Sequence, residues 1–292
     1  MSPESTSPPA GDGAVHLSCA DSAFPRLSHG AALDVIVDLG IGAVDLCVWA
    51  GYDHNPPERA LADTAAEAER IGAELSRRSL DLADVYLIQA ESFEQLAVNH
   101  PDQAVREESF RMFDSLLDLA SRLGSPGLTI LPGALFDGVD ETESLRLAAS
   151  ELERRAERAR EAGLRFSVEP HFRSVIATPA RTAALLELTE QVEIALDITH
   201  FTFQTYEDHE SDPLLPRTRH VHLRQAAPGN LQTRLAEGTI DYPALRDKLL
   251  ARGYDGYFAI EYQWEEGWLD FTHVDCIAET ADMRDLMLGV TP

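Results

Sequence analysis

The chain has 292 residues, of which 44% are hydrophobic and 7% aromatic, so it is long enough to bury a sizeable core. Its 50 acidic residues against 24 lysines and arginines give a formal net charge of −26, which opposes nonspecific binding to the phosphate backbone of nucleic acids. No apolar run reaches the roughly 18 residues that a membrane-spanning helix needs.

The N-terminal segment MSPESTSPPAGDG, residues 1–13, is rich in Ser, Pro and Gly and lacks the basic and apolar regions of a signal peptide. We expect it to be a disordered leader and residues 14–292 to form one domain. The cysteines, Cys19, Cys47 and Cys276, are odd in number and unpatterned, so they are expected to be free thiols of a cytoplasmic protein.

From residue 14 onward, short runs with the composition of β-strands alternate with longer helical segments. The predicted strands are residues 14–20, 43–49, 80–88, 127–133, 164–171, 192–198, 219–225 and 257–263. The predicted helices are residues 29–40, 62–79, 102–124, 141–163, 178–191 and 241–253, several of them ending at a glycine. Eight β-α units without a composition break predict an α/β fold, a single (β/α)₈ TIM barrel. A GxGxxG loop after the first strand, a P-loop and a GxSxG elbow are all absent.

The stretch RHVHLRQ, residues 219–225, has two histidines and an arginine at every second position. In a strand, this alternation places His220, His222 and Arg224 on the same face. An HxH pair is common by chance, so the stretch by itself is a weak indication of a metal site. Other strand ends must support it.

Polar residues also close the strands on either side of this stretch. FSVEPH ends in Glu169 and His171, EIALDITH brings Asp197 and YFAIEY brings Glu261. Active residues of such barrels lie at the C-terminal ends of the strands, so four successive strands would deliver these carboxylates and His222 to one rim. Each residue taken singly could instead be a strand-end cap paired with an arginine.

Three carboxylates at a buried rim would repel one another unless a cation lay between them. Three carboxylates and one imidazole form an oxygen-rich set that favours Mn²⁺, with Mg²⁺, Co²⁺ and Zn²⁺ as alternatives. His220, one layer deeper than His222, is expected to support that histidine rather than to bind metal.

The motifs VEPH, LDITH, HVHLR and EGTIDYPALRDKLLARGYDGYFAIEY resemble those of the xylose isomerase-like TIM barrels, the sugar phosphate isomerase/epimerase group, from about His16 to the end. The resemblance implies that Glu169, Asp197, His222 and Glu261 bind one divalent metal ion. It further implies a metal-dependent isomerase or epimerase acting on a ketose or a related polyol carbonyl compound. In such an enzyme Glu169 and Glu261 would be the acid/base pair, and proton abstraction would proceed through an enediolate.

The same resemblance implies substrate contacts for His200 and for Arg224, although Arg224 comes two residues after His222 and not six as in the ketose 3-epimerases. His171 is expected either to contact substrate or simply to fill its loop. The aromatic residues near the strand ends could wall a sugar pocket or pack within the fold; these are Trp49, Phe172, Trp264 and Trp268.

Three other functions of similar barrels have to be weighed. A lyase of the same fold, such as an inosose or dehydroshikimate dehydratase or a 3-oxo-glycoside deglycosidase with a small partner subunit, would begin with the same proton abstraction. A non-catalytic sugar-binding barrel is also compatible with the sequence. Whatever the function, the protein could form a homo-oligomer. A three-zinc endonuclease would need further histidines, where this chain has Leu131, Asn230 and Gln232.

Overall fold

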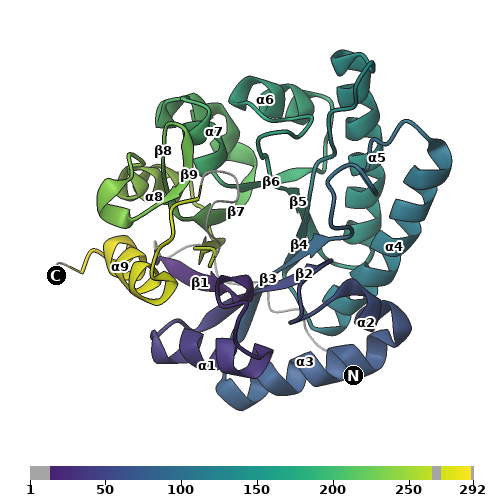
Figure 1. Ribbon diagram of the computed structural model, residues 1–292. Helices are drawn as coiled ribbons and strands as arrows, with labels where there is room; N and C mark the ends of the chain where they lie inside the picture. The colour runs from purple at the N-terminus through teal and green to yellow at the C-terminus, as the bar shows by residue number, and fades with distance from the viewer. Residues whose placement is uncertain (1–13, 265–270, 291–292) are drawn as a thin grey trace.

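The computed structural model describes residues 14–264 and 271–290, so the expected leader lies outside the described residues. All eight predicted strands are present, and they close into a parallel barrel in the order β1-β10-β7-β6-β5-β4-β3-β2. The strands are β1 (His16–Ala20), β2 (Ala43–Trp49), β3 (Asp81–Ile88), β4 (Gly127–Ile130), β5 (Arg165–Val168), β6 (Glu193–Leu196), β7 (Thr218–Leu223) and β10 (Tyr257–Ile260). The expected (β/α)₈ barrel is thereby confirmed, with the helices outside the ring of strands (Figure 1).

The helices form where apolar residues recur at helical spacing and where the first turn is capped. Thr178, for example, accepts a hydrogen bond from the backbone N–H of Arg181 (3.2 Å), and Pro179 takes the first helical position. The α-helices are α1 (His29–Asp38), α2 (Pro57–Ala62), α3 (Thr64–Arg78), α4 (Gln103–Arg122), α5 (Glu141–Glu161), α6 (Pro179–Glu187), α7 (Thr199–Phe203), α8 (Tyr242–Leu250) and α9 (Cys276–Leu288). The described connections also contain three 3₁₀ segments, η1 (Asp21–Ala23), η2 (Asp208–Arg217) and η3 (Leu235–Glu237).

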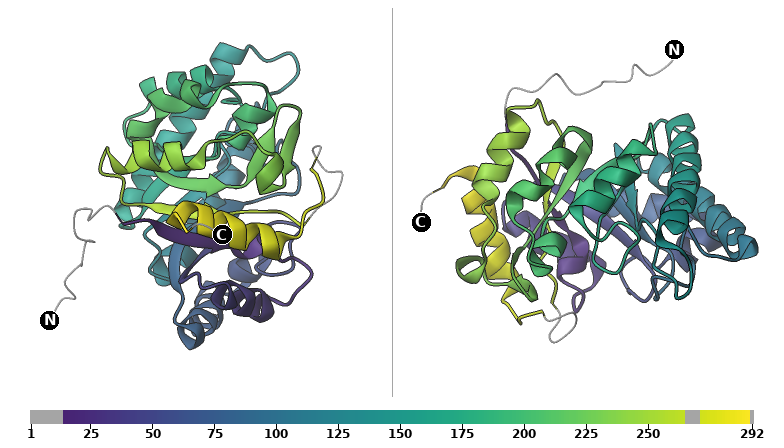
Figure 2. Two further views of the ribbon diagram at one scale, coloured as in Figure 1. Left: turned by 90° about the vertical axis from the view of Figure 1, so that its left-hand side faces the viewer. Right: turned by 90° about the horizontal axis from the view of Figure 1, so that it is seen from above.

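Several of these elements were not predicted from the sequence. They are α2, α7, α9 and an antiparallel hairpin of β8 (Gln225–Ala227) and β9 (Asn230–Thr233), inserted between β7 and α8. Helix α9 lies on the outside of the barrel between α8 and α1, as two views agree (Figures 1 and 2). Among the described residues, no helix combines the length and apolarity needed to cross a bilayer.

The main apolar core lies between the strands and the surrounding helices, whereas the interior of the barrel holds buried polar side chains. At its base, Arg219 of β7 donates hydrogen bonds to Asp84 on β3 (2.8 Å), Thr129 on β4 (3.1 Å) and Ser167 on β5 (2.6 Å). Strict alternation along β7 would turn Arg219 away from the face that carries His220. A register shift between β6 and β7 at this point interrupts that alternation, and Arg219 crosses the interior.

Gly127 makes room for the guanidinium of Arg219. A Cβ atom at Gly127 would lie 2.6 Å from Nη1 of Arg219 and 2.9 Å from the carbonyl oxygen of Arg165. Neither neighbour is free to move, because Arg219 is buried among its partners and Arg165 contributes backbone. The base of the barrel therefore depends on a glycine at position 127.

We expect Gly127→Ala to lower the free energy of unfolding by about 1–3 kcal/mol, since it overpacks a rigid site. The matched control is Gly72→Ala in α3, where a Cβ would meet nothing within 4 Å and should raise stability by about 0.5–1 kcal/mol. Equilibrium urea unfolding of both variants measures the two effects. Equal stabilities for both variants would contradict this account of the base of the barrel.

Candidate metal centre

Four neighbouring strands bring the predicted ligand residues to one point. Glu169 follows β5, Asp197 follows β6, His222 lies in β7 and Glu261 follows β10, and these strands are adjacent in the barrel. One ligand atom from each residue lies within 4.8 Å of the other three, and all four side chains are buried. The C-terminal ends of the strands thus create a compact set of three carboxylates and one imidazole.

His222 lies between two of the carboxylates. Its Nδ1 is 2.6 Å from Oε1 of Glu169 and 3.5 Å from Oε2 of Glu261. Burial alone would lower the pKa of His222, but Glu261, Glu169 and then Asp45 outweigh burial and raise the pKa to about 10. The negative charge at this point therefore favours any cation that can reach it.

The two glutamates respond differently to the same surroundings. Burial, reinforced by Glu169 and Asp197 against the opposing effect of His222 and Arg224, raises the pKa of Glu261 to about 7. The pKa of Glu169 is lowered, because its hydrogen bond and charge interaction with His222 outweigh its burial. A proton placed among these groups is therefore held by Glu261 more readily than by Glu169.

The donor set fits a divalent metal ion. Asp197 commits Oδ1 to Thr199, accepting hydrogen bonds from its backbone N–H (2.9 Å) and its hydroxyl (2.5 Å), so Oδ2 is the oxygen left to the centre. Three carboxylates and an imidazole are the oxygen-rich set that Mn²⁺ and Mg²⁺ accept, and a buried cluster of this charge needs cations to remain ionised.

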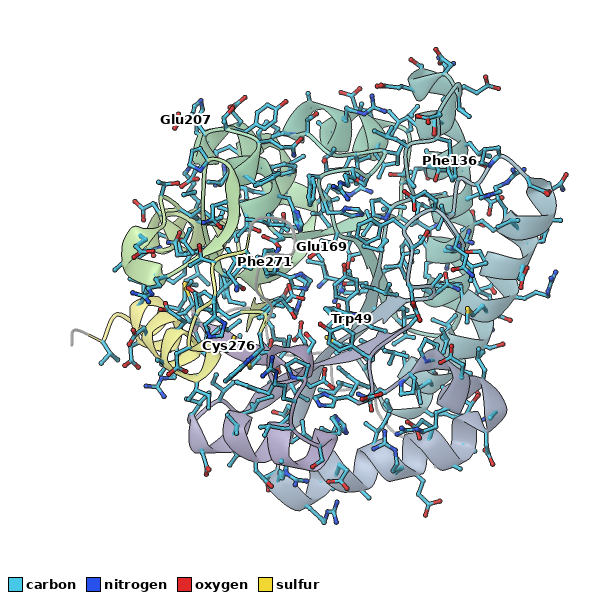
Figure 3. The ribbon with its side chains drawn as sticks, viewed as in Figure 1. Trp49, Phe136, Glu169, Glu207, Phe271 and Cys276 are labelled. Carbon is cyan, nitrogen blue, oxygen red and sulfur yellow. The ribbon has the colours of Figure 1, made fainter. Side chains whose placement is uncertain are left out.

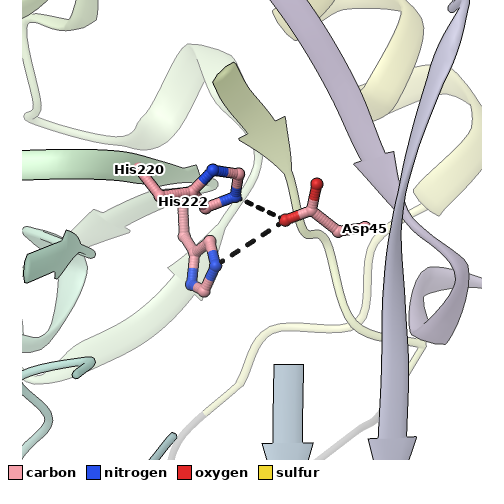
Figure 4. Close-up of side chains that lie close together, drawn as sticks. All are labelled: Asp45, His220 and His222. Carbon is pink, nitrogen blue, oxygen red and sulfur yellow. Dashed lines mark hydrogen bonds and ion pairs between the residues drawn. The ribbon is translucent and has the colours of Figure 1, made fainter. Parts of the chain in front are cut away.

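Asp45 on β2 supports the histidines from the opposite side of the barrel interior. Its Oδ2 accepts a hydrogen bond from Nε2 of His220 (2.5 Å) and lies 3.9 Å from Nε2 of His222 (Figure 4). Its Oδ1 accepts a hydrogen bond from the hydroxyl of Ser18 (2.6 Å). Because Asp45 faces Nε2 of His222, it favours the ring orientation that presents Nδ1 to the carboxylates.

Neutral donors hold the two glutamates in place. The Tyr86 hydroxyl donates to Oε2 of Glu169 (2.5 Å), and the Gln263 amide donates to Oε1 of Glu261 (3.3 Å). Burial, and then the charge of Glu169, raises the pKa of Tyr86 well above its usual value, so the phenol keeps its proton. Each glutamate therefore keeps a second oxygen on a fixed hydrogen-bond donor.

Arg224 supplies a permanent positive charge beside the centre. Its Nη2 lies 2.7 Å from Oδ2 of Asp197, and its Nη1 lies 3.2 Å from Oε2 of Glu261. Tyr242, the first residue of α8, fixes the backbone at this point: its hydroxyl donates to the Arg224 carbonyl (2.5 Å) and accepts from the Arg224 N–H (3.3 Å). Arg224 is thereby held on two of the carboxylates.

A cavity of about 240 Å³ opens onto these residues. His171 and His200 line it, as do Glu169, Glu261 and Arg224; Trp264 is not among its lining residues and packs against the main core instead. Trp268 lies outside the described residues. The cavity therefore joins the candidate metal centre to most of the predicted substrate-contacting residues.

Both histidines of the cavity are neutral at physiological pH. Burial lowers the pKa of His171, and burial followed by the charge of Arg224 lowers the pKa of His200 well below its usual value. The Nδ1–H of His171 donates to the carbonyl of Phe172 (2.6 Å), which leaves Nε2 as a hydrogen-bond acceptor. Because His171 Nε2 has no hydrogen-bond partner among the described residues, it can accept a hydrogen bond from a hydroxyl of a bound molecule.

Three residues of the site, Asp45, Tyr86 and Gln263, were not predicted from the sequence. Asp45 and Tyr86 carried a detectable signal, because each is a polar side chain at an inward position of an apolar strand. Gln263 follows Glu261 at the next position on the same face and could have been found by continuing the alternation. Their partners are far away in the chain and were not predictable from local patterns.

Comparisons with known proteins agree with this architecture. A family model described as xylose isomerase-like TIM barrel matches residues 33–284. A Streptomyces coelicolor protein provisionally named hydroxypyruvate isomerase is 27% identical over 268 residues, which cover 85% of this chain and 89% of that protein.

Solved structures share the fold at lower identity. D-psicose 3-epimerase with D-tagatose, from Clostridium cellulolyticum H10, is 13% identical with a TM-score of 0.75, over 94% of this chain and 99% of that chain. A xylose isomerase-like TIM barrel protein from Mycobacterium smegmatis in complex with magnesium is 17% identical with a TM-score of 0.68, over 95% and 98%. Further neighbours include other sugar epimerases and a protein assigned as a 3-DHS dehydratase from Bacillus anthracis.

We expect His222→Ala to lower the affinity for Mn²⁺ by at least about 100-fold, because it removes one ligand and the group between two carboxylates. Calorimetric titration of chelator-treated protein measures the affinity, and elemental analysis of the purified protein gives the occupancy. The control is His209→Ala, which removes an exposed histidine in η2. Parental affinity in His222→Ala would exclude this residue as a ligand.

Metal binding should release protons. Since the pKa of His222 is raised to about 10, chelator-treated protein carries this proton at pH 7–9, and a metal ion must displace it. The affinity for Mn²⁺ should therefore rise by about tenfold per pH unit across that range.

The folding stability of chelator-treated protein should depend on pH through the same proton on His222. A raised pKa stabilises the fold fully below about 6.5, and this contribution is lost as the pH rises through about 10. For metal binding, calorimetric titrations of Mn²⁺ into chelator-treated protein, in buffers of different ionisation enthalpy, count the protons that the metal ion displaces. An affinity independent of pH between 7 and 9 would contradict the linkage.

Proposed function

The chain belongs to the xylose isomerase-like TIM barrel family, and from this premise we propose that it is a divalent-metal-dependent isomerase or epimerase of a ketose or a related polyol carbonyl compound. One observation carries the proposal: two buried glutamates, Glu169 and Glu261, both lie within 3.5 Å of Nδ1 of His222 and both line the cavity. A pair of carboxylates in this position can remove a proton from substrate carbon and return it.

Glu169, Asp197, His222 and Glu261 would hold the metal ion, which supplies Lewis-acid polarisation of a substrate carbonyl and its neighbouring hydroxyl. Manganese is our first choice, and the oxygen-rich donor set supports it equally with magnesium. Glu169, with its lowered pKa, is ionised and available as the base, and Glu261, with a pKa of about 7, can carry the proton that is delivered. Glu169 would take a proton from substrate carbon, and Glu261 would deliver its own proton to the resulting enediolate, to the same carbon in an epimerase and to the adjacent carbon in an isomerase.

The other side chains of the cavity would orient the substrate. His171 offers an acceptor nitrogen, and Arg224 and His200 lie beside Asp197 at the edge of the centre. Tyr86 and Gln263 hold the glutamates by hydrogen bonds, so the carboxylates keep their positions as a proton moves. Because the whole set is buried, water has little access to the reacting carbon.

A lyase of the same fold is the second candidate. Elimination needs carbon deprotonation on one face only, and the opposite pKa shifts of Glu169 and Glu261 favour two unequal roles. A nuclease is not supported. Where an endonuclease would carry further histidines, Leu131 lines the cavity and Gln232 exchanges hydrogen bonds with the Gln263 backbone (2.7 and 2.9 Å).

The setting that we propose for this enzyme is the cytoplasm, without nucleic acid or membrane as partner. The three cysteines are buried and free, as a reducing compartment allows. A homo-oligomer or a small partner subunit is compatible with the activity.

We expect Glu169→Gln and Glu261→Gln each to slow solvent-deuterium incorporation into substrate by about 10²–10⁴-fold at matched Mn²⁺ occupancy. The amide can still offer an oxygen to the metal but cannot carry the proton. NMR detects incorporation, and metal analysis fixes the occupancy. Glu187→Gln on the exposed surface of α6 is the control and should retain the parental rate.

The pattern of loss separates the candidate reactions. Loss in both variants supports the two-base isomerase or epimerase, whereas loss in one variant favours the lyase. Parental rates in both variants at equal metal occupancy would exclude the glutamates as acid and base.

A further inference from the structure

Two apolar clusters, each separate from the main core, line the cavity above the candidate metal centre. The first contains Trp49 and Tyr86, with Leu131 packed against it, and comes from β2, β3 and the end of β4. We call it the first wall. The second, which we call the second wall, contains Phe172, Leu231 and Phe271 and comes from the segments after β5 and around β9. The barrel thus surrounds a polar centre with apolar surfaces, and Figure 3 places Trp49 and Phe271 near Glu169 around the barrel axis.

Both walls are held by aromatic contacts. The Trp49 ring meets the Tyr86 ring edge-on at 5.3 Å between centroids (86°), and Phe172 lies nearly parallel to His200 at 5.9 Å (23°) and against Phe203 at 5.0 Å. Trp49 is 8% exposed and Phe172 9%, so neither ring can turn freely out of its wall. The apolar surface is therefore a fixed part of the cavity and not an accidental exposure.

Apart from Tyr52 and the exposed Glu91, the charged and hydrogen-bonding side chains that line the cavity are grouped around the metal centre, where Arg224 faces the carboxylates. Arg224 is the one lysine or arginine among the lining residues that the structure describes, and its guanidinium faces Asp197 and Glu261 at 2.7 and 3.2 Å. Nδ1 of His171 lies 2.6 Å from the Phe172 carbonyl, and Nε2 of His200 lies 3.3 Å from Nη2 of Arg224. A phosphate or carboxylate group of a ligand would therefore meet no unmatched cation on these walls.

We propose that the substrate is an uncharged α-hydroxyketone that carries an aryl group. The carbonyl and hydroxyl would lie at the polar centre, and the aryl group would fill the space between the first and second walls. The inference rests on the metal-dependent proton transfer of the proposed function and departs from it in replacing the polyol chain of the substrate with an aryl group. A polyol chain in that space would leave its hydroxyls facing Leu131, Leu231 and Phe271, where burial without partners is unfavourable.

Four small probes test the proposal, and each carries the same reacting group, a hydroxymethyl carbon next to a carbonyl. They are 2-hydroxyacetophenone, dihydroxyacetone, dihydroxyacetone phosphate and hydroxypyruvate. NMR in deuterated water measures exchange at the carbinol carbon with the Mn²⁺-loaded protein, after subtraction of exchange without protein. Calorimetry measures the binding of the same probes. We expect kcat/KM and affinity for 2-hydroxyacetophenone to exceed those of the other three by about tenfold or more, because the phenyl group buries apolar area.

Substitutions in the walls give a second readout. Leu131→Asn and Phe172→Ala should lower kcat/KM for 2-hydroxyacetophenone at least about tenfold more than for dihydroxyacetone. The control is Phe110→Ala, which removes an aromatic ring beneath Arg154, away from the cavity, and should leave both values unchanged. Equal losses for both probes would mean that the walls have only a structural role.

The outcomes separate this inference from the proposed function. If dihydroxyacetone, its phosphate or hydroxypyruvate exchanges as well as the aryl probe, the proposed function stands and the inference is overturned. If no probe exchanges, the proposed function fails for these α-hydroxyketones. The calorimetric affinities of the probes then test the inference. Tighter binding of 2-hydroxyacetophenone would then support it, and equal or weaker binding would overturn it.

Discussion

Three carboxylates buried within a few ångströms of one another are the constraint on which the rest of this structure depends. Glu169, Asp197 and Glu261 cannot all stay ionised in such a place unless positive charge is near. The protein meets this demand with His222, whose pKa rises accordingly, and with Arg224, which spans two of the carboxylates. A divalent ion at the same point would be the stronger form of the same compensation, and with Arg224 it would bring the cluster to neutrality.

The barrel makes this concentration of charge tolerable, because it fixes each group from more than one side. The carboxylates emerge from adjacent strands, so their separation is set by the spacing of the sheet rather than by flexible loops. Thr199 and Tyr86 then hold individual carboxylate oxygens, while Tyr242 holds the backbone of Arg224. The buried layer around Arg219 closes the base of the barrel below this centre. Rigidity of this kind allows a proton to move without a rearrangement of its neighbours.

Proton transfer and substrate specificity would depend on two different regions of one cavity. The polar centre at the strand ends is built from the motifs that resemble the family, and structures that share this fold include ones with only 13% or 19% identity. The first wall comes mainly from barrel strands, whereas the second wall comes from connecting segments, where such barrels vary their function most readily. The same proton-transfer centre can therefore serve different compounds, depending on which side chains stand above it.

The sequence by itself determined the strands, most of the helices and the placement of Glu169, Asp197, His222 and Glu261 on one rim, because these follow from local periodicity and from the parallel arrangement of the strands. Only the tertiary structure decided what supports them. Asp45 contacts His220 across 175 residues of chain, and Tyr86 reaches Glu169 across 83, so no local pattern could pair them. The inward turn of Arg219 required an irregularity between two strands. The two apolar walls come from different halves of the chain, and they line one cavity only because the barrel closes. Periodicity fixes which face a side chain takes, whereas its partners across a barrel are fixed only when the barrel closes.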